Sequence, residues 1–331
     1  MSSDNLKIAI RMTNNQPMFD RVTENIRAEL QTPEKVEFIF CSSDEEFASA
    51  GSDVEVAVCF RMKEAVFSTL SGLKWIHFAV TGIDHAMYES IVSSDVLITK
   101  AIGFHSKVTA EYAVAMMLYF ERNLELSLKF KSSRKWNQKE IVKQTGTLSG
   151  KTLGILGQGA IGRELAKMAK AFGMKVIVTT RTSDSKSQFD NVDISYPLNE
   201  LEDLMSKSDY FAICAPLTKQ TRGLIDAKKL SRMKKSAILI NIARGAIVDE
   251  SALYESLVKK EIAGAGIDVY DTEPLPEESP LFDLDNVFMS PHVAGNFSEY
   301  TPLAATDFGR NLDRYMNGKE LNCVVDKSLR Y

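Results

Sequence analysis

The chain has 331 residues, of which 44% are hydrophobic and 25% charged, and its formal net charge at pH 7 is -4. These values are typical of a globular protein of about two domains, and the slight excess of acids argues against non-specific nucleic-acid binding and against a basic membrane-surface role. No apolar run approaches the ~18 residues that a membrane helix needs, and the N-terminus has no signal-peptide core.

Strand and helix patterns alternate over the N-terminal part of the chain, which is typical of a parallel α/β unit. The clearest helix is predicted over Phe19–Leu30. Apolar runs predict strands at Leu6–Arg11, Val36–Cys41, Val54–Phe60 and Lys74–Val80.

Thr109–Phe130 shows one long helical pattern, with apolar residues along one face. Its length favours a helix that runs between two domains over a helix that belongs to one local unit. The next segment, Lys129–Lys143, carries six lysines and arginines against the single acid Glu140. A charge run of this kind is usually exposed to solvent, and the segment is therefore interpreted as a solvated loop.

A short apolar run at Thr152–Leu156 has the pattern of a buried parallel strand, and a helical pattern follows it. Between them lies G-x-G-x-x-G, formed by Gly157, Gln158, Gly159, Ala160, Ile161 and Gly162. Gly157 would permit the tight turn, Gly159 the approach of a pyrophosphate, and Gly162 close packing of helix on strand. The helix N-terminus would attract the anion. A glycine-rich turn without a ligand is the alternative, but a second strand at Lys175–Thr180 completes the βαβ spacing and favours a dinucleotide site.

Four further apolar runs predict strands of the same unit, at Tyr210–Ala215, Ala237–Ile242, Gly264–Val269 and Val287–Ser290. Each ends at a candidate functional residue, and doubly wound sheets bind their ligands at the carboxyl ends of strands. A last helix is predicted over Thr301–Asn317, with Gly318 as its C-cap. This helix falls outside the nucleotide-binding repeat, and we expect it to return to the N-terminal lobe.

The four cysteines are far apart and form no C-x-x-C pair, and the four histidines lack metal-ligand spacing. Two of the cysteines, Cys59 and Cys214, lie inside strand-like runs and are predicted to be buried free thiols. The sequence therefore predicts a reduced, cytoplasmic protein that holds no metal.

Polar residues follow three of the predicted strands. In the first group, Asn241–Glu250, Arg244 comes directly after an apolar strand, where its guanidinium could bind a carboxylate bidentately. A local ion pair of this arginine with Asp249 or Glu250 is the alternative.

The second group, Asp268–Pro274, places three acids in a turn, and the third, Ser290–Gly295, contains His292 just past a strand end. An acid beside His292 would hold its tautomer and favour its charged form, giving a general acid/base. A lone histidine is more often a structural residue, which is the alternative. The residues alone predict a nucleotide-binding enzyme whose site holds an arginine, an acid and a histidine.

Four motifs resemble those of the D-isomer-specific 2-hydroxyacid dehydrogenase family, in the family's order and spacing. They are G-Q-G-A-I-G (Gly157–Gly162), N-I-A-R-G-A-I-V-D-E-S-A-L (Asn241–Leu253), G-A-G-I-D-V-Y-D-T-E-P-L (Gly264–Leu275) and S-P-H-V-A-G (Ser290–Gly295). A weaker N-terminal match extends the resemblance over nearly the whole chain. Within the family, the chain looks like the glyoxylate and hydroxypyruvate reductases.

The resemblance implies an α/β fold with two Rossmann-like, doubly wound parallel-sheet domains and a cleft between them. The substrate-binding, flavodoxin-like domain would be discontinuous, comprising residues 1–102 and 298–331, and the dinucleotide-binding Rossmann domain would comprise residues 103–297. The resemblance also implies a homodimer that pairs through Thr109–Phe130 and the loop that follows.

The resemblance further implies a catalytic triad of Arg244, Glu273 and His292. Arg244 would bind the carboxylate and the carbonyl of a 2-oxo acid, orienting it and stabilising the developing alkoxide. His292 would donate a proton to the carbonyl oxygen as hydride arrives from the nicotinamide. Glu273 would keep His292 charged until that transfer.

The family also binds the substrate carboxylate through backbone N–H groups of a glycine turn, which maps to Ala79–Asp84 and within it to Thr81 and Gly82. Arg61, after the third predicted strand, would contact the distal end of the substrate. The alternatives are a turn that merely ends a strand and an arginine that lies on the surface.

Further cofactor contacts are implied at Ala215, Pro216, Thr221, Ile242, Ala243, Asp268 and Gly295. NAD-dependent members carry an acid at the end of the second Rossmann strand, for the ribose hydroxyls, and here Thr180 stands in its place. Arg181, Thr182 and Ser183 follow. Because these residues could bind a 2′-phosphate, NADP is the predicted preferred cofactor and NAD the second. An Arg181 side chain that points to solvent is the alternative.

The resulting hypothesis is an NAD(P)H-dependent reduction of a small 2-oxo acid, glyoxylate or hydroxypyruvate by resemblance, to the D-2-hydroxy acid. Formate dehydrogenases of the same superfamily are disfavoured because they lack a glutamate in the role of Glu273. A non-enzymatic, dinucleotide-sensing corepressor or scaffold of the same fold is the alternative, but the sequence shows no disordered tail or interaction-rich extension.

Overall fold

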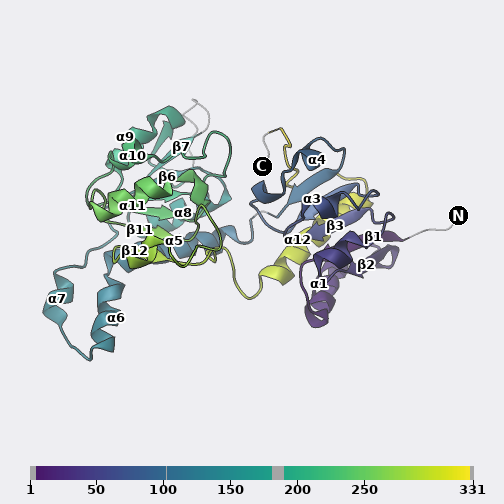
Figure 1. Ribbon diagram of the computed structural model, residues 1–331, viewed down its shortest axis with the longest axis horizontal. Helices are drawn as coiled ribbons and strands as arrows, with labels where there is room; N and C mark the ends of the chain where they lie inside the picture. Colours follow the sequence, from purple (N-terminus) through teal and green to yellow (C-terminus); the bar gives the residue numbers. More distant parts are fainter. Residues whose placement is uncertain (1–4, 102, 181–189, 329–331) are drawn as a thin grey trace. The chain divides into compact units, whose positions relative to one another are not determined.

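The computed structural model describes residues 5–101, 103–180 and 190–328. Its internal contacts divide the chain into two compact units (Figure 1). Unit 1 comprises Met1–Phe104 and Phe297–Tyr331, and unit 2 comprises His105–Asn296. Among the described residues, each unit holds one sheet of parallel strands, which confirms the predicted α/β fold class.

Within the described residues, the sheet of unit 1 has five strands in the order β2-β1-β3-β4-β5. Four of them lie where apolar runs predict strands. The edge strand β5 is not predicted, because it is only four residues long and only its two central residues are buried. The strands are β1 (Leu6–Arg11), β2 (Val36–Phe40), β3 (Val56–Cys59), β4 (Trp75–Phe78) and β5 (Leu97–Lys100).

The last helix of the chain, α12, packs along the first helix, α1, in unit 1. A Cβ at Gly309 of α12 would lie 3.0 Å from the carbonyl oxygen of Ile26, so the glycine allows the two helices to approach closely. Phe308 and Leu312 of α12 share a buried cluster with Trp75 of β4. The helices of this unit are α1 (Gln16–Ala28), α2 (Asp44–Ala48), α3 (Glu64–Phe67), α4 (Glu89–Val92) and α12 (Tyr300–Met316).

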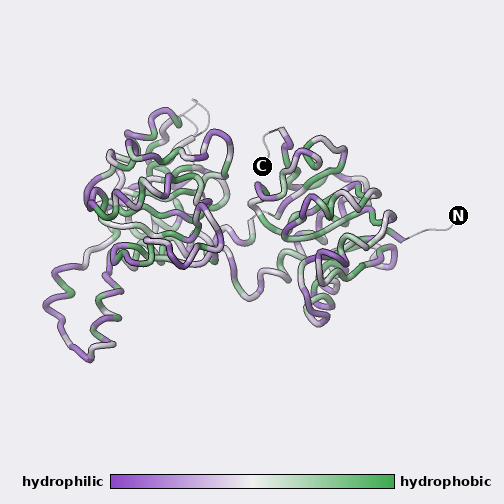
Figure 2. The backbone as a smooth tube through the Cα atoms, in the orientation of Figure 1, coloured by the Kyte–Doolittle hydropathy of each residue, from purple (hydrophilic) through white to green (hydrophobic). Residues whose placement is uncertain are grey.

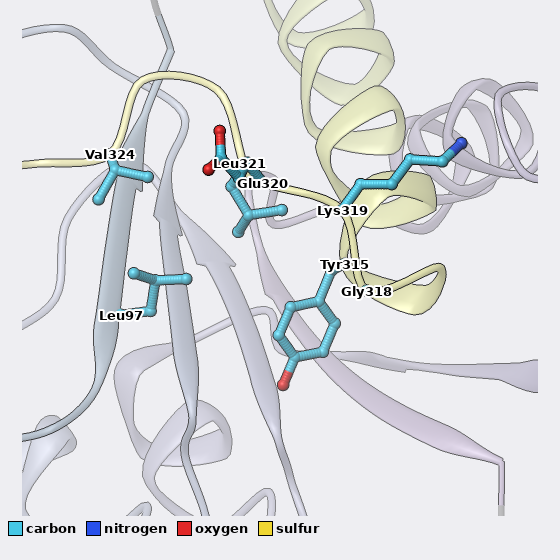
Figure 3. A pocket seen from close by; sticks show the side chains of 7 residues that line it. All are labelled: Leu97, Tyr315, Gly318, Lys319, Glu320, Leu321 and Val324. Atoms are coloured by element: carbon cyan, nitrogen blue, oxygen red, sulfur yellow. The ribbon is translucent and has the colours of Figure 1, made fainter.

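The residues after α12 form a strap (residues 318–328) against the edge strand β5. Asn311 of α12 exchanges two hydrogen bonds with Asn322, at 3.0 and 2.8 Å, and the N–H of Val325 donates to the carbonyl oxygen of Ile98 (2.9 Å). A hollow of about 500 Å³ lies beside them (Figure 3). It is lined by Leu97, Tyr315, Gly318, Lys319, Glu320, Leu321 and Val324.

In the described part of unit 2, the sheet has seven strands in the order β12-β11-β10-β9-β6-β7-β8. The strand order reverses between β6 and β9, where doubly wound sheets bind their ligands. The edge strand β8 is not predicted, because only one of its four residues is buried. The strands are β6 (Thr152–Leu156), β7 (Lys175–Thr180), β8 (Ile194–Pro197), β9 (Tyr210–Ile213), β10 (Ile238–Asn241), β11 (Gly264–Ile267) and β12 (Val287–Met289).

Helices cover both faces of this second sheet (Figure 1), and hydrophobic stretches (green) run through the interior of unit 2 (Figure 2). Ala113 and Leu165 on one face, and Leu204 and Phe211 on the other, belong to two separate buried clusters. The helices are α5 (Ser106–Glu121), α6 (Leu124–Ser132), α7 (Gln138–Val142), α8 (Ala160–Ala171), α9 (Leu201–Lys207), α10 (Ala227–Leu230) and α11 (Glu250–Val258). Short 3-10 helices lie at Pro33–Lys35, Asp84–Ala86, Leu198–Glu200, Gly245–Ile247 and Pro280–Asp283.

The prediction of a single long helix over Thr109–Phe130 is wrong. Two helices, α5 and α6, occupy this stretch, and they are separated at Asn123, whose φ of 46° is left-handed. The side chain of Asn123 then caps α6 by accepting a hydrogen bond from the N–H of Leu126 (3.2 Å). Asparagine is one of the few residues that adopt this conformation readily, and apolar periodicity alone does not reveal the break.

The charged segment predicted as a solvated loop is solvated but largely helical. It contains the end of α6 and all of α7, which Asn137 caps. Figure 1 shows α6 and α7 extending away from the body of unit 2, and we refer to residues 124–143 as the arm. Both helices are fully described and hold no buried residue. Apolar side chains are exposed along the arm, with Leu128 at 61%, Trp136 at 94% and Val142 at 63%.

Along the described part of the chain, no helix combines the length and the apolar character needed to cross a bilayer. Cys59 is a buried free thiol, which confirms its predicted state, and Cys214 is free and partly buried.

Candidate active site

The glycine loop joins β6 to α8 where the strand order of unit 2 reverses. Gly157 has a φ of 95°, and its N–H donates to Oγ1 of Thr179 (3.1 Å). A Cβ on Gly157 would lie 2.8 Å from Cα of Ala215, and one on Gly162 would lie 2.3 Å from the carbonyl oxygen of Gly157. Both positions therefore need glycine for the turn and for the packing of helix on strand.

The middle glycine, Gly159, faces open space. It is the N-cap residue of α8, and no described atom lies within 4 Å of where its Cβ would be. The N–H groups and the dipole at a helix N-terminus favour an anion. The loop, which also includes Gln158, Ala160 and Ile161, thus fits the pyrophosphate of a dinucleotide.

β7 ends at Thr180, the position where an acid would face the ribose. Thr180 is buried, and its Oγ1 donates to the carbonyl oxygen of Tyr196 in the neighbouring β8 (3.5 Å). A neutral hydroxyl therefore stands at this strand end in place of a carboxylate. Arg181, Thr182 and Ser183, the residues predicted to bind the 2′-phosphate, lie outside the described residues.

The residues predicted to bind cofactor after β9 and β10 lie at the same sheet edge as the glycine loop. Ala215 and Pro216 follow β9, and Oγ1 of Thr221 donates to the carbonyl oxygen of Pro216 (2.7 Å). Ile242 and Ala243 follow β10 directly. Because neighbouring parallel strands end at the same edge, the structure brings these residues together with the loop.

Arg244 stands just past β10 in a turn that Asn241 holds. Nδ2 of Asn241 donates to the carbonyl oxygen of Arg244 (3.0 Å), and its Oδ1 accepts from the N–H of Ala243 (3.2 Å). The two acids considered as local partners of Arg244 both bind backbone N–H groups. Asp249 caps α11, and Glu250 accepts from the turn after β11.

His292 and Glu273 form a direct pair. Nδ1 of His292 lies 2.7 Å from Oε2 of Glu273, and Oε1 of Glu273 accepts from the N–H of Tyr270 (3.0 Å). The backbone thus anchors Glu273, which in turn orients the imidazole. Both side chains are partly exposed, so a small molecule in solution can reach them.

Asp268 is predicted to contact the cofactor. In the structure, its carboxylate accepts hydrogen bonds from the loop that carries His292. Its Oδ1 accepts from Oγ of Ser290 (2.6 Å) and from the N–H of Val293 (2.9 Å), and its Oδ2 accepts from the N–H of Ala294 (2.9 Å). Asp268 is 1% exposed. Sequence reasoning missed this role, although an acid at the end of an apolar strand indicates a buried carboxylate that needs several donors.

Gly245 is a second residue that sequence reasoning missed. A Cβ here would lie 1.9 Å from the carbonyl carbon of Tyr270, so only glycine lets the turn after β10 pack on the turn after β11. This contact joins the segment of Arg244 to that of Glu273. A glycine directly after a candidate catalytic residue is the signal that could have found it. Gly295, a predicted cofactor contact, is less restricted, since its Cβ would lie 3.2 Å from Oγ1 of Thr109 on α5.

The predicted substrate-binding residues of the N-terminal sequence follow β3 and β4 in unit 1. Arg61 follows β3 and is exposed, and the turn Ala79–Asp84 follows β4. In this turn, Oγ1 of Thr81 donates to the carbonyl oxygen of Ala101 (2.8 Å), and Gly82 is partly exposed. No predicted site residue is among the described residues that line the hollow of Figure 3.

Comparison with known proteins identifies relatives along most of the chain. Residues 114–294 match the family model described as D-isomer specific 2-hydroxyacid dehydrogenase, NAD binding domain. The chain is 33% identical to a glyoxylate reductase from Pyrococcus furiosus over 274 residues, covering 81% of this chain and 80% of that protein. It is 36% identical to a glyoxylate reductase from Thermococcus litoralis over 262 residues, covering 78% of each.

Solved structures share the fold. A D-isomer specific 2-hydroxyacid dehydrogenase family protein from Aeromonas salmonicida has a TM-score of 0.86 at 24% identity, covering 98% of this chain and 99% of that one. An NADPH-dependent glyoxylate/hydroxypyruvate reductase from Sinorhizobium meliloti, solved with NADP and sulfate, has a TM-score of 0.83 at 23% identity, covering 99% of this chain and all of that one.

Gly245 and Gly159 offer a matched test of how tightly the site is packed. Gly245→Ala forces a methyl group against the backbone of Tyr270, and overpacking of this kind costs about 1–3 kcal/mol. Gly159→Ala points a methyl group into open space at a helix N-cap, where we expect a loss below about 1 kcal/mol. Urea unfolding of both variants measures the difference, and equal losses of stability would contradict the packing described for Gly245.

Proposed function

The chain belongs to the D-isomer specific 2-hydroxyacid dehydrogenase family, and on this premise we propose that it reduces a small 2-oxo acid, glyoxylate or hydroxypyruvate, to the D-2-hydroxy acid. The observation that carries the proposal is the 2.7 Å pair of His292 and Glu273 at the sheet edge that also holds Arg244. The glyoxylate reductases from Pyrococcus furiosus and Thermococcus litoralis support the substrate class through their names.

The proposed proton donor is His292. A reduced nicotinamide dinucleotide, bound at the glycine loop, supplies the hydride. Because Nδ1 of His292 faces Glu273, the proton moves from Nε2, the nitrogen on the other side of the ring. The carboxylate of Glu273 stabilises the charged imidazolium before the transfer and fixes the ring's orientation.

Arg244 is the proposed anchor of the substrate. Its planar guanidinium can bind a carboxylate through two parallel hydrogen bonds, and the same group stabilises the negative charge that develops on the carbonyl oxygen. In unit 1, the backbone of the turn with Thr81 and Gly82 is proposed to bind the same carboxylate. Arg61 is proposed to contact the distal end of the substrate.

NADP is the proposed preferred cofactor. The support is the neutral Thr180 at the end of β7, because a carboxylate there would repel a 2′-phosphate. The sequence places Arg181 and Thr182 next along the chain, and an arginine binds phosphate through charge-assisted hydrogen bonds.

We also propose a homodimer that pairs through α5 and the arm. The apolar side chains of Leu128, Trp136 and Val142 support this, because the arm exposes them to water on α6, on α7 and in the connection between the two helices. Exposed apolar surface of this kind marks an interaction site, and a two-fold dimer is the commonest homo-oligomer.

The function is tested through Arg244. With glyoxylate and a reduced coenzyme, Arg244→Ala should raise KM and lower kcat, reducing kcat/KM by at least about a hundredfold, since two charge-assisted hydrogen bonds are lost. Arg244→Lys should restore part of the rate, because the charge remains but the planar fork does not. The surface variant Arg232→Ala is the control. Wild-type kcat/KM in Arg244→Ala would refute the assignment, and a wild-type chain that turns over no 2-oxo acid would refute the function.

The cofactor is tested by measuring kcat/KM for NADPH and NADH with the same substrate. We expect a preference for NADPH of at least about tenfold, which needs only ~1.4 kcal/mol. Arg181→Ala should reduce that preference, while Arg181→Lys should keep part of it because the charge remains. Equal or better kinetics with NADH in the unmodified chain would contradict the proposal and leave the acid–base chemistry untouched.

Light scattering tests the dimer. The unmodified chain should scatter as a species of about twice 36.9 kDa, and Leu128→Glu on the arm should shift it to the monomer, because a buried charge opposes association. Phe282→Glu, at another exposed apolar residue of unit 2, is the control and should leave the dimer intact. A monomeric unmodified chain at micromolar concentration would disprove this assembly.

A further inference from the structure

Tyr300, the first residue of α12, reaches the turn that follows β4. Its hydroxyl donates to the carbonyl oxygen of Ala79 (3.1 Å). Ala79 is 0% exposed, so its carbonyl has no access to water as a substitute partner. Ala79 is also the first residue of the turn Ala79–Asp84, and the hydrogen bond therefore fixes the point at which the backbone leaves the strand.

The ring of Tyr300 lies within an aromatic cluster. Its centroid is 6.0 Å from that of Phe60, 5.1 Å from that of Phe104 and 5.9 Å from that of Phe297. Phe60 directly precedes Arg61, which is proposed, together with the turn, to contact the substrate. One side chain thus contacts both segments of unit 1 that are proposed to meet the substrate.

The environment of Tyr300 keeps its hydroxyl a donor. Burial raises the pKa of Tyr300 to about 12 from the ordinary 10.0, so the phenol is protonated and able to donate at neutral pH. Thr81, two residues further along the turn, is held separately by its hydrogen bond to the carbonyl oxygen of Ala101 (2.8 Å).

We propose that Tyr300 is a positioning residue, which holds the Ala79–Asp84 turn in the conformation that presents its backbone N–H groups to the substrate carboxylate. The role rests on the proposed function, since it supposes that this turn binds the carboxylate of a 2-oxo acid. Tyr300 acts through Ala79 and makes no contact with the reacting atoms. Its influence is therefore on substrate binding and not on proton or hydride transfer.

The chain offers a closely matched pair of variants on one helix. Tyr300→Phe removes the hydroxyl that binds Ala79 and keeps the ring in its cluster. Tyr315→Phe, at the other end of α12, removes a hydroxyl that donates to Oε1 of Glu55 (2.8 Å) beside the hollow of Figure 3. Both variants lose one hydrogen bond of a partly buried tyrosine, but only the first touches the turn.

In Tyr300→Phe we expect KM for glyoxylate to rise about tenfold with kcat and the KM of the coenzyme nearly unchanged, because an interaction made equally in the ground and transition states is lost. Tyr315→Phe should leave all three parameters close to wild type. A KM within about twofold of wild type in Tyr300→Phe, or the same rise in both variants, would overturn the proposal.

Amide hydrogen exchange separates this role from the proposed function. Residues 79–84 should exchange faster in Tyr300→Phe than in the unmodified chain and in Tyr315→Phe, because the buried carbonyl loses its donor. This readout needs no turnover. If the unmodified chain reduces no 2-oxo acid, the proposed function fails, while unaltered exchange over residues 79–84 would refute the positioning role by itself.

Discussion

The buried carboxylate of Asp268 is the interaction on which the candidate active site depends. A charge removed from water is stable only when donors surround it, and the donors here all come from the loop after β12. The need to satisfy this charge fixes the loop, including His292, whose φ of 54° lies in the left-handed region. The hydroxyl of Tyr270 adds a further bond to the carbonyl oxygen of Ser290 (3.1 Å), so the loop is held from two positions on the segment after β11.

The same segment connects the histidine to the rest of the site. The N–H of Tyr270 donates to Glu273, and the backbone carbonyl group of Tyr270 packs closely against Gly245. The ends of β10, β11 and β12 thus form one packed layer, in which the orientation of each candidate catalytic side chain depends on backbone contacts with its neighbours. Sites built on rigid strands in this way hold their groups more accurately than sites on isolated loops.

The motifs with fixed residue types could be predicted from the sequence, whereas contacts between distant segments could not. The glycine loop follows from Gly157, Gly159 and Gly162. Gly157 and Gly162 each meet a steric requirement that only glycine meets, and Gly159 leaves open the space that a pyrophosphate would enter. The edge strands β5 and β8 lack a distinct pattern because half or more of their residues are not fully buried. The break at Asn123 is one left-handed residue, which periodicity does not register. The role of Asp268 depends on donors more than twenty residues away along the chain.

The return of α12 to unit 1 has a consequence for how the protein is made. Phe308 and Leu312 belong to the same core as Trp75 and Ile26, and the strap pairs with β5 only after the last stretch of chain is present. During synthesis, domains fold as their sequences emerge from the ribosome. Unit 2, whose sequence is continuous, is complete while the core of unit 1 still lacks a helix. The sequence of unit 1 is therefore completed after that of unit 2, and a ribosome stalled before α12 leaves the core of unit 1 without Phe308 and Leu312.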